Sequence, residues 1–330
     1  DLGRLLEIGK KSFKAVDRDR ADIAAVLYTG GTTGTPKGVM LSHENVNTSS
    51  HNVSFCERST PDDRALCFLP FNHVFGQMHI MNATILSSGC LELLPSFDMD
   101  RVLEIMQSGR LTKFFAVPTV YMRLLTLGDL EKRLGRLRYC FSAAASMPVE
   151  IVRQWKERTG ISIAEGYGMT EAMPVSYNHY HRHVVGSIGQ PVHGVEVQIR
   201  DKSGKQLGQG QEGEICVRGP IVMKGYLNDP EGTRTASWDG GWYRSGDVGL
   251  FDKDGYLYII DRLKDMMPIL SVQHVDMQGY TGMQAEGPEE LLAEPGIERP
   301  DLLIGQQDIV LQERPVGYVG DDTDQGLVHR

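Results

Sequence analysis

The first half of the chain alternates short apolar runs with amphipathic segments. The apolar runs predict buried strands, at residues 23–28, 39–41, 65–69, 91–94, 114–117, 139–142 and 161–165. Helix-like segments lie between them, one with Ser42 as its N-cap and others at residues 76–87, 100–108, 119–127 and 148–159. Because strand and helix alternate from residue 22 to about residue 170, the pattern predicts an open, mostly parallel α/β sheet.

The pattern changes after about residue 185. Short runs of alternating apolar and polar residues follow one another, at residues 195–199, 213–218, 249–252 and 256–260. Turn sequences rich in Asp and Gly separate them, at residues 201–204 and 252–255. Short strands joined by such turns predict a smaller antiparallel β subdomain, a distorted barrel.

Charge is distributed unevenly over the 330 residues. Of the 43 acidic and 34 basic residues, 12 acidic residues and 3 arginines lie in residues 267–330. Residues 1–266 therefore carry 31 of each sign, and the last 64 residues carry the whole net charge of −9. This predicts a boundary near Met266. It also argues against nucleic acid as a partner, because nucleic-acid binders concentrate Lys and Arg.

Cysteine usage favours a reducing, cytoplasmic setting. Five scattered cysteines contain no CxxC pair, so neither a disulfide framework nor a zinc cluster is predicted: Cys56, Cys67, Cys90, Cys140 and Cys216. No stretch approaches the roughly 18 apolar residues of a membrane span, which leaves peripheral membrane contact open. The chain begins at Asp1 with neither an initiator Met nor an apolar leader, so we interpret it as cut from a longer polypeptide.

Residues 29–38 combine four glycines, four threonines, a proline and a lysine directly after an apolar run. Such a composition predicts a loop. Glycines let backbone amides approach a polyphosphate, the threonines add hydroxyl donors, and Lys37 supplies a cation. The segment is not a Walker A loop, because Gly38 rather than Ser or Thr follows the lysine. A flexible surface turn is the alternative interpretation.

Four motifs, in order along the chain, resemble those of the adenylate-forming (AMP-binding) superfamily, which includes acyl-CoA synthetases and long-chain fatty acid–CoA ligases. They are TGGTTGTPKG at 29–38, GYGMTE at 166–171, GWYRSGD at 241–247 and DRLKD at 261–265. The resemblance covers about residues 22–266. It implies an incomplete N-terminal domain of this superfamily, truncated at both ends.

The resemblance also implies a division of the chain. The expected segments are a linker at 1–21, an α/β subdomain that binds ATP and the acyl group at 22–185, a β-rich subdomain at 186–262, a hinge at 263–266 containing Lys264, and an acidic tail at 267–330. The tail contains no lysine, whereas the superfamily carries a catalytic lysine in a C-terminal lid. Mistranslation, a disordered extension and a small unrelated domain remain alternative interpretations of the tail.

The nucleotide site is assigned by the same resemblance. The phosphate loop contributes Thr29, Gly30, Gly31, Thr32, Thr33 and Gly34. Ala144, within the run of small residues at 142–146, and Gly166 and Gly168 leave room for purine and acyl group. Tyr167 is expected to stack on adenine, with core packing as the alternative. Asp247 is expected at the ribose hydroxyls, although an isolated Gly-Asp pair is usually only a turn, and Arg262 is expected at ribose or phosphate.

The residues expected to act in catalysis are Lys37, Thr170, Glu171 and His73. Thr170 offers its hydroxyl to the α-phosphate, and Glu171 is a hard oxygen ligand suited to Mg²⁺. Without the other motifs, Glu171 would be interpreted as a charge at a helix N-terminus. The segment LPFNHVFG resembles the superfamily's P-x-x-H segment and places His73 at the carboxylate pocket, with a structural role as the alternative.

Three alternating histidines raise a second metal hypothesis. On a strand, His179, His181 and His183 would share a face and could bind a metal. A packing or solvent-facing role is the favoured interpretation, since the superfamily needs no metal there. The preceding Ser176 to His179 segment resembles bacterial fatty-acyl ligases, which favours an aliphatic acid.

The predicted reaction has two steps and uses ATP, Mg²⁺ and CoA. A carboxylic acid, expected to be a fatty acid, forms acyl-AMP, and a thiol then displaces AMP to give a thioester. Weak or no activity is expected of this chain because its tail has no lid lysine. The alternatives are a nucleotide-binding remnant without catalysis, or an adenylation module that delivers to a carrier protein. Oligomeric state is left open.

Overall fold

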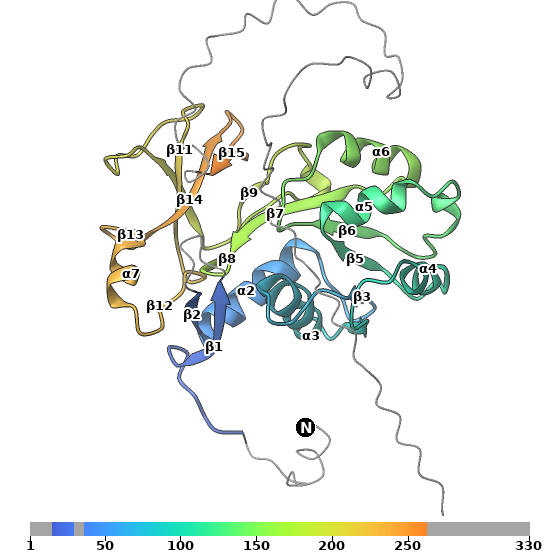
Figure 1. Ribbon diagram of the computed structural model, residues 1–330, viewed down its shortest axis with the longest axis horizontal. Coiled ribbons are helices and arrows are strands. Elements are labelled where there is room, and N and C mark those ends of the chain that lie inside the picture. The colour runs from blue at the N-terminus through green and yellow to red at the C-terminus, as the bar shows by residue number, and fades with distance from the viewer. Residues whose placement is uncertain (1–14, 30–35, 263–330) are drawn as a thin grey trace, which may run out of the picture. The chain divides into compact units, whose positions relative to one another are not determined.

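The computed structural model describes residues 15–29 and 36–262 (Figure 1). Gly30, Gly31, Thr32, Thr33 and Gly34 of the expected phosphate loop lie outside the described residues. The expected hinge residue Lys264 and the acidic tail lie outside them too. All the structural statements that follow refer to the described part.

A seven-stranded sheet forms the centre of the α/β part, in the order β4-β3-β5-β6-β7-β8-β9. Its strands are β3 (Arg64–Cys67), β4 (Cys90–Leu93), β5 (Lys113–Ala116), β6 (Tyr139–Ser142), β7 (Ile163–Met169), β8 (Ala172–Tyr177) and β9 (Gln190–Pro191). Pairing from β4 through to β7 is parallel, and β8 and β9 add antiparallel pairs. The expectation of a mostly parallel sheet is confirmed for this part.

Helical segments alternate with the strands in this part of the chain. They are α2 (His43–Cys56), the π-helical segment η1 (Phe75–Asn82), α3 (Ala83–Leu86), α4 (Met99–Gln107), α5 (Pro118–Leu125) and α6 (Val149–Thr159), with short 3₁₀ turns at η2 (Leu130–Lys132) and η3 (Tyr180–Arg182). Ser42 is the N-cap of α2, and its hydroxyl accepts a hydrogen bond from the backbone of Asn45. The predicted start of this helix is therefore confirmed.

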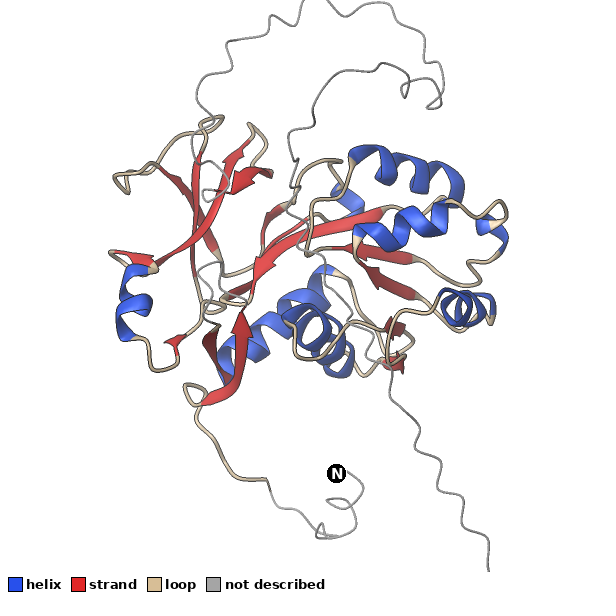
Figure 2. Cartoon of the chain, in the orientation of Figure 1, coloured by secondary structure: helices blue, strands red, loops and turns tan. Residues whose placement is uncertain are grey.

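Helices cover both faces of the central sheet (Figure 2). Helices α4, α5 and α6 pack on one face, and η1 with the β-rich part packs on the other. Neighbouring residues of β5 separate these two cores, because Phe114 belongs to the first and Phe115 to the second. Both are fully buried, which explains why this parallel strand is apolar without alternation.

Strands β1 (Ile23–Thr29) and β2 (Lys37–Ser42) correct one expectation. They form an antiparallel pair in a separate three-stranded sheet with β12 (Gly225–Tyr226), rather than joining the parallel sheet. The connection between β1 and β2 is too short for a parallel crossover, which needs a dozen or more residues. The predicted phosphate loop is therefore the connection of a hairpin.

The β-rich part is an antiparallel sheet in the order β10-β11-β14-β13, with β15 paired to β14. Its strands are β10 (Glu196–Arg200), β11 (Gly213–Arg218), β13 (Ser237–Trp238), β14 (Trp242–Phe251) and β15 (Leu257–Arg262), and α7 (Pro230–Thr235) precedes β13. The strongly twisted β14 is central and the longest (Figure 1). Sequence patterning predicted most of β10, β11 and β15 but only the last part of β14.

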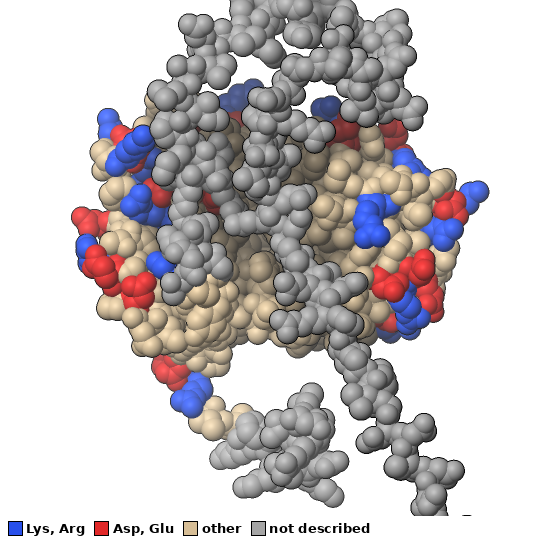
Figure 3. Space-filling view, viewed as in Figure 1, with Lys and Arg blue, Asp and Glu red and all other residues tan. Residues whose placement is uncertain are grey.

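Charged side chains are mixed on the visible surface (Figure 3). On the face drawn in Figure 3, visible acidic and basic side chains are interspersed, with no large patch of one sign. In the described part of the chain, no helix is long and apolar enough to cross a membrane.

Candidate active site

A wall of small residues and one tyrosine separates two hollows. Gly166, Tyr167 and Gly168 of β7 and Ala144 after β6 line both hollows. Ala144 has φ of +72°, a left-handed conformation that costs energy for a residue with a side chain and often marks a functional site. The wall has no room for larger residues: a Cβ at Gly166 would lie 2.8 Å from the ring of Phe141.

The smaller hollow has a volume of about 40 Å³. Aromatic side chains make most of its wall, from Phe75 and His79 of η1, Phe141 of β6 and Tyr177 of β8. His73 lines the same hollow. Its Nδ1 accepts a hydrogen bond of 3.1 Å from the backbone N–H of Phe75. The side chain of His73 is exposed to solvent, but neighbouring atoms desolvate the ring enough to lower its pKa below the ordinary value, so the ring is mostly neutral at pH 7.

The larger hollow has a volume of about 470 Å³, within the range of small-ligand sites. Tyr167 and Asp247 meet there, and the tyrosine hydroxyl donates to the carboxylate. Arg262 of β15 lies directly across from Asp247 of β14 in the strand register. The structure therefore brings Tyr167, expected at the adenine, together with Asp247, expected at the ribose, from strands of two different sheets, and places Arg262 across from Asp247 in the strand register.

Glu165 is a residue that the sequence analysis missed. It lines the larger hollow and is only 7% exposed. Its Oε2 has no hydrogen-bond partner, and neither does Nε2 of His183, 3.9 Å away. Burial raises the pKa of Glu165 to about 8, so the carboxyl is mostly protonated at pH 7 and can donate a hydrogen bond. Its place directly before Gly166 and Tyr167 was the available signal, but nothing in that pattern indicated burial.

Lys37 and Glu171 are joined through a residue far away in the sequence. Tyr226 of β12 donates a hydrogen bond of 2.9 Å to Oε1 of Glu171. The ammonium group of Lys37 lies over the ring of Tyr226, 4.6 Å from its centre, and 3.6 Å from Oδ2 of Asp229. The sequence analysis named Lys37 and Glu171 but missed Tyr226 and Asp229, which become neighbours only through the pairing of β12 with β2.

Two further residues expected at the site are Thr29, at the end of β1, and Thr170, in the turn after β7. Thr29 ends β1, and its hydroxyl lies 3.5 Å from the carbonyl oxygen of Lys37. Thr170 lies in the turn between β7 and β8, next to Glu171. One oxygen of Glu171 is held by Tyr226 and the side chain is only partly buried. A single such carboxylate fits the way proteins bind Mg²⁺, which is usually completed by substrate phosphates and water.

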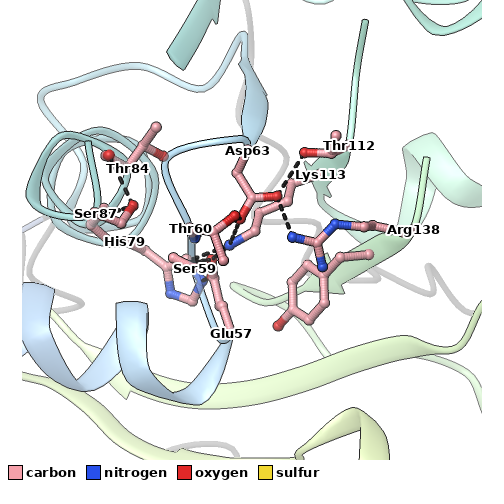
Figure 4. Close-up of polar contacts among 12 residues, drawn as sticks. Glu57, Ser59, Thr60, Asp63, His79, Thr84, Ser87, Thr112, Lys113 and Arg138 are labelled. Carbon is pink, nitrogen blue, oxygen red and sulfur yellow. Dashed lines mark hydrogen bonds and ion pairs between the residues drawn. The ribbon is translucent and has the colours of Figure 1, made fainter. Parts of the chain in front are cut away.

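Behind the smaller hollow lies a buried cluster of charged side chains (Figure 4). Lys113 Nζ lies 2.9 Å from Glu57 Oε2 and 3.5 Å from Asp63 Oδ2, and all three side chains are at most 3% exposed. Glu57 Oε1 lies 2.9 Å from His79 Nε2. Burial pushes the pKa of Glu57 upward, but the Lys113 charge and the His79 hydrogen bond outweigh it and hold the pKa below its ordinary value.

The three alternating histidines do not form a metal site. They follow β8 in and around the 3₁₀ turn η3, so they are not on a strand. The rings of His179 and His181 lie 5.2 Å apart, whereas His183 points to Glu165. Among the residues that the structure describes, no group of three His, Cys, Asp or Glu side chains could hold a metal ion.

Comparisons with known proteins agree with this geometry. The chain is 38% identical over 252 residues to a long-chain-fatty-acid–CoA ligase of Bacillus subtilis (strain 168), which covers 74% of this chain and 45% of that protein. It is 35% identical over 307 residues to a feruloyl-CoA synthase of Amycolatopsis sp, which covers 90% of this chain and 60% of that protein. The chain thus spans about half the length of the curated relatives it matches.

Solved structures give the same fold. ATP-bound MatB from Rhodopseudomonas palustris is 38% identical and superimposes with a TM-score of 0.77, covering 80% of this chain and 53% of that one. O-succinylbenzoate coenzyme A synthetase from Bacillus subtilis in complex with AMP is 27% identical, with a TM-score of 0.73, and covers 80% of this chain and 55% of that one. A family model described as AMP-binding enzyme matches residues 4–227, well over half of the sequence, and the chain belongs to that family.

Proposed function

We propose that this chain carries the adenylation centre of an acid–CoA ligase, which activates a carboxylic acid as acyl-AMP and then transfers the acyl group to CoA. The observation that carries the proposal is the shared wall. A carboxylate in the smaller hollow and a nucleotide in the larger one would meet along Ala144 and the segment from Gly166 to Gly168. Holding two reactants in contact is the main contribution of such a site.

The proposed first step is a displacement at phosphorus. A carboxylate oxygen bonds to the α-phosphorus of ATP, the bond between the α-phosphorus and the bridging oxygen breaks, and pyrophosphate leaves. Tyr167 and Asp247 would hold the nucleoside, and Thr170 and Lys37 would bind phosphate oxygens. Glu171 would hold Mg²⁺, which supplies positive charge to the phosphates. His73 lines the smaller hollow and would contact the carboxylic acid there.

In the proposed second step, the CoA thiolate bonds to the acyl carbon, the bond to the phosphate oxygen breaks, and AMP leaves. The relatives named above are acid–CoA ligases, with acids that differ from one to the next. Fatty acid is the class favoured by the Bacillus subtilis relative. Five cysteines without disulfides, four of them buried, are consistent with the proposed reducing, cytoplasmic setting.

ATP–pyrophosphate exchange tests the proposal directly. We expect exchange that depends on an added carboxylic acid. The rate should be low, because residues 267–330 contain no lysine that could take the role of the superfamily's catalytic lid lysine. Asp247→Ala should lower exchange by roughly 10²-fold, by analogy with the loss of one transition-state contact. Asp254→Ala, in an exposed turn of the same sheet, is the matched control and should leave exchange unchanged.

The alternatives give different results in the same assay. MgATP binding without exchange for any acid, from acetate to palmitate and aryl acids, would replace the proposal by a nucleotide-binding protein without catalysis. Exchange followed by acyl transfer to a phosphopantetheinyl carrier protein, but not to CoA, would identify an adenylation module instead.

A further inference from the structure

The smaller hollow ends at a floor of packed rings. The His79 and Phe141 rings lie 4.2 Å apart, Phe141 and Tyr177 stack at 4.9 Å, and Phe75 meets Phe141 edge-on at 5.8 Å. Each of these four side chains is at most 4% exposed. Rings that contact one another on several sides have little room to rotate, because protein interiors are close-packed. The floor is therefore fixed by packing.

Hydrogen bonds from behind hold the same rings. Glu57 Oε1 accepts from His79 Nε2 at 2.9 Å and from the Tyr177 hydroxyl at 3.2 Å. The Tyr177 hydroxyl also lies 2.6 Å from that of Tyr139. Glu57 is itself fixed by Lys113, as shown above (Figure 4). Moving His79 or Tyr177 aside would break bonds to a buried carboxylate, which is costly.

The volume of the hollow limits the acyl group. About 40 Å³ corresponds to roughly three water-sized groups, whereas an apolar cavity that binds benzene measures about 150 Å³. A chain of eight or more carbons, or an aromatic ring, exceeds this volume and would have to displace lining side chains; on the side of the floor, the charged cluster of Glu57, Asp63 and Lys113 lies behind the rings. Displacing these rings would place methylene groups against buried charges and remove the contacts that compensate them.

The lining also limits the chemistry of the acyl group. Among the described residues that line this hollow, the basic side chains are His73 and His79, with no Lys or Arg. Nε2 of His79 is already bonded to Glu57. Desolvation lowers the pKa of the exposed His73, so this ring is not a fixed cation for a second carboxylate either. Val74, Phe75 and Met173 supply apolar contact instead.

From these observations we infer that the site takes a short aliphatic monocarboxylic acid, with roughly two or three carbons beyond the carboxyl group. The inference rests on the proposed function and deepens it by naming the substrate class. It places the acid at the short end of the fatty acids. It also separates this chain from two of its relatives, which are named for long-chain fatty acids and for feruloyl-CoA.

Binding of stable acyl-adenylate mimics tests the inference without requiring turnover. Acyl-sulfamoyl adenosines with propanoyl, butanoyl, octanoyl, hexadecanoyl and benzoyl groups would be titrated into the full chain by calorimetry. We expect propanoyl and butanoyl to bind most tightly, and octanoyl, hexadecanoyl and benzoyl at least roughly tenfold more weakly. Octanoyl or benzoyl binding as tightly as propanoyl would overturn the substrate class and leave the proposed function standing. Failure of every analogue to bind would overturn both.

Two variants of residues that line the hollow, and one control variant outside it, test whether the size of the hollow sets the preference for acyl length. Met173→Ala shortens a partly buried lining residue that packs against a separate apolar cluster, and should improve octanoyl relative to propanoyl by about tenfold. His79→Ala opens the floor itself and should shift the preference further, provided that thermal unfolding shows a folded protein. Met122→Ala, on the exposed face of α5, is the matched control and should leave the ratio unchanged. An unchanged ratio in folded Met173→Ala would contradict the inference.

Discussion

Glu57 and Glu165 have the same side chain and similar burial, at 3% and 7% exposure, but opposite electrostatic states. Glu57 is surrounded by Lys113, His79 and Tyr177, and its pKa lies below the ordinary value. Glu165 has only His183 at 3.9 Å, and burial raises its pKa to about 8. Burial alone therefore decides nothing about charge. The partners decide it, because a nearby cation offsets the desolvation that favours the neutral form.

The difference matches the positions of the two carboxyl groups. Glu57 lies behind the ring floor of the smaller hollow, where a fully bonded carboxylate fixes His79 and Tyr177 in place. Glu165 lines the larger hollow, where a neutral carboxyl with an unpartnered oxygen is available to a ligand. Glu57 thus contacts the rings behind the smaller hollow, whereas Glu165 lies in the wall of the larger hollow.

The largest expected effect comes from removing the cation between the two buried carboxylates. Lys113→Met leaves Glu57 and Asp63 close together in a dry interior, and should lower the free energy of unfolding by roughly 3–5 kcal/mol. Urea denaturation measures the change. Adding Glu57→Gln to this variant should recover part of the loss. A loss below about 1 kcal/mol would mean that water reaches the cluster.

The second prediction concerns the uncompensated carboxyl group. The folded pKa of Glu165, about 8, lies above its ordinary 4.5, so the neutral group contributes stability that is complete below about pH 4.5 and is lost as pH rises through 8. Between these limits the free energy of unfolding should fall by on the order of a few kcal/mol. Glu165→Gln should remove this part of the pH dependence. Parallel denaturation curves of both proteins from pH 5 to 9 measure it, and identical slopes would contradict the raised pKa.

A smaller effect is expected from one hydroxyl group of the compensated cluster. Tyr177→Phe keeps the stacked ring but removes the hydroxyl that contacts Glu57 and Tyr139. The expected loss is about 1–2 kcal/mol, the cost of leaving buried polar groups with one partner fewer. Tyr28→Phe, at a tyrosine that is 65% exposed, is the control and should have no measurable effect on urea denaturation. Equal stability of Tyr177→Phe and the parent chain would show that the rings alone hold the floor.

The smallest effect is expected at an exposed ion pair. Arg234 and Glu231 form a pair on α7 whose side chains are 72% and 69% exposed. Arg234→Ala should leave the free energy of unfolding unchanged within error, because water and salt screen exposed pairs. A loss as large as that of Lys113→Met would mean that burial does not explain the difference between ion pairs in this protein.

Much of the architecture could be predicted from the sequence because it depends on local patterns. Apolar runs identified the parallel strands, and Ser42 identified the start of α2. The antiparallel pairing of β1 with β2 in a separate sheet was not predicted, since an apolar run looks the same in either kind of sheet. Short strands such as β12 and β13, with two residues each, have too little pattern to be recognised.

The sequence by itself determined the family and the order of its motifs, because Gly166 to Glu171 and Gly241 to Asp247 are contiguous segments whose residue types can be recognised along the chain. Only the tertiary structure decided which side chains meet. Glu57 and Lys113 are 56 residues apart, and Tyr226 and Glu171 are 55 residues apart. The two states of Glu57 and Glu165 follow from such contacts, since desolvation and neighbouring charge depend on distances in space, which a linear pattern does not contain.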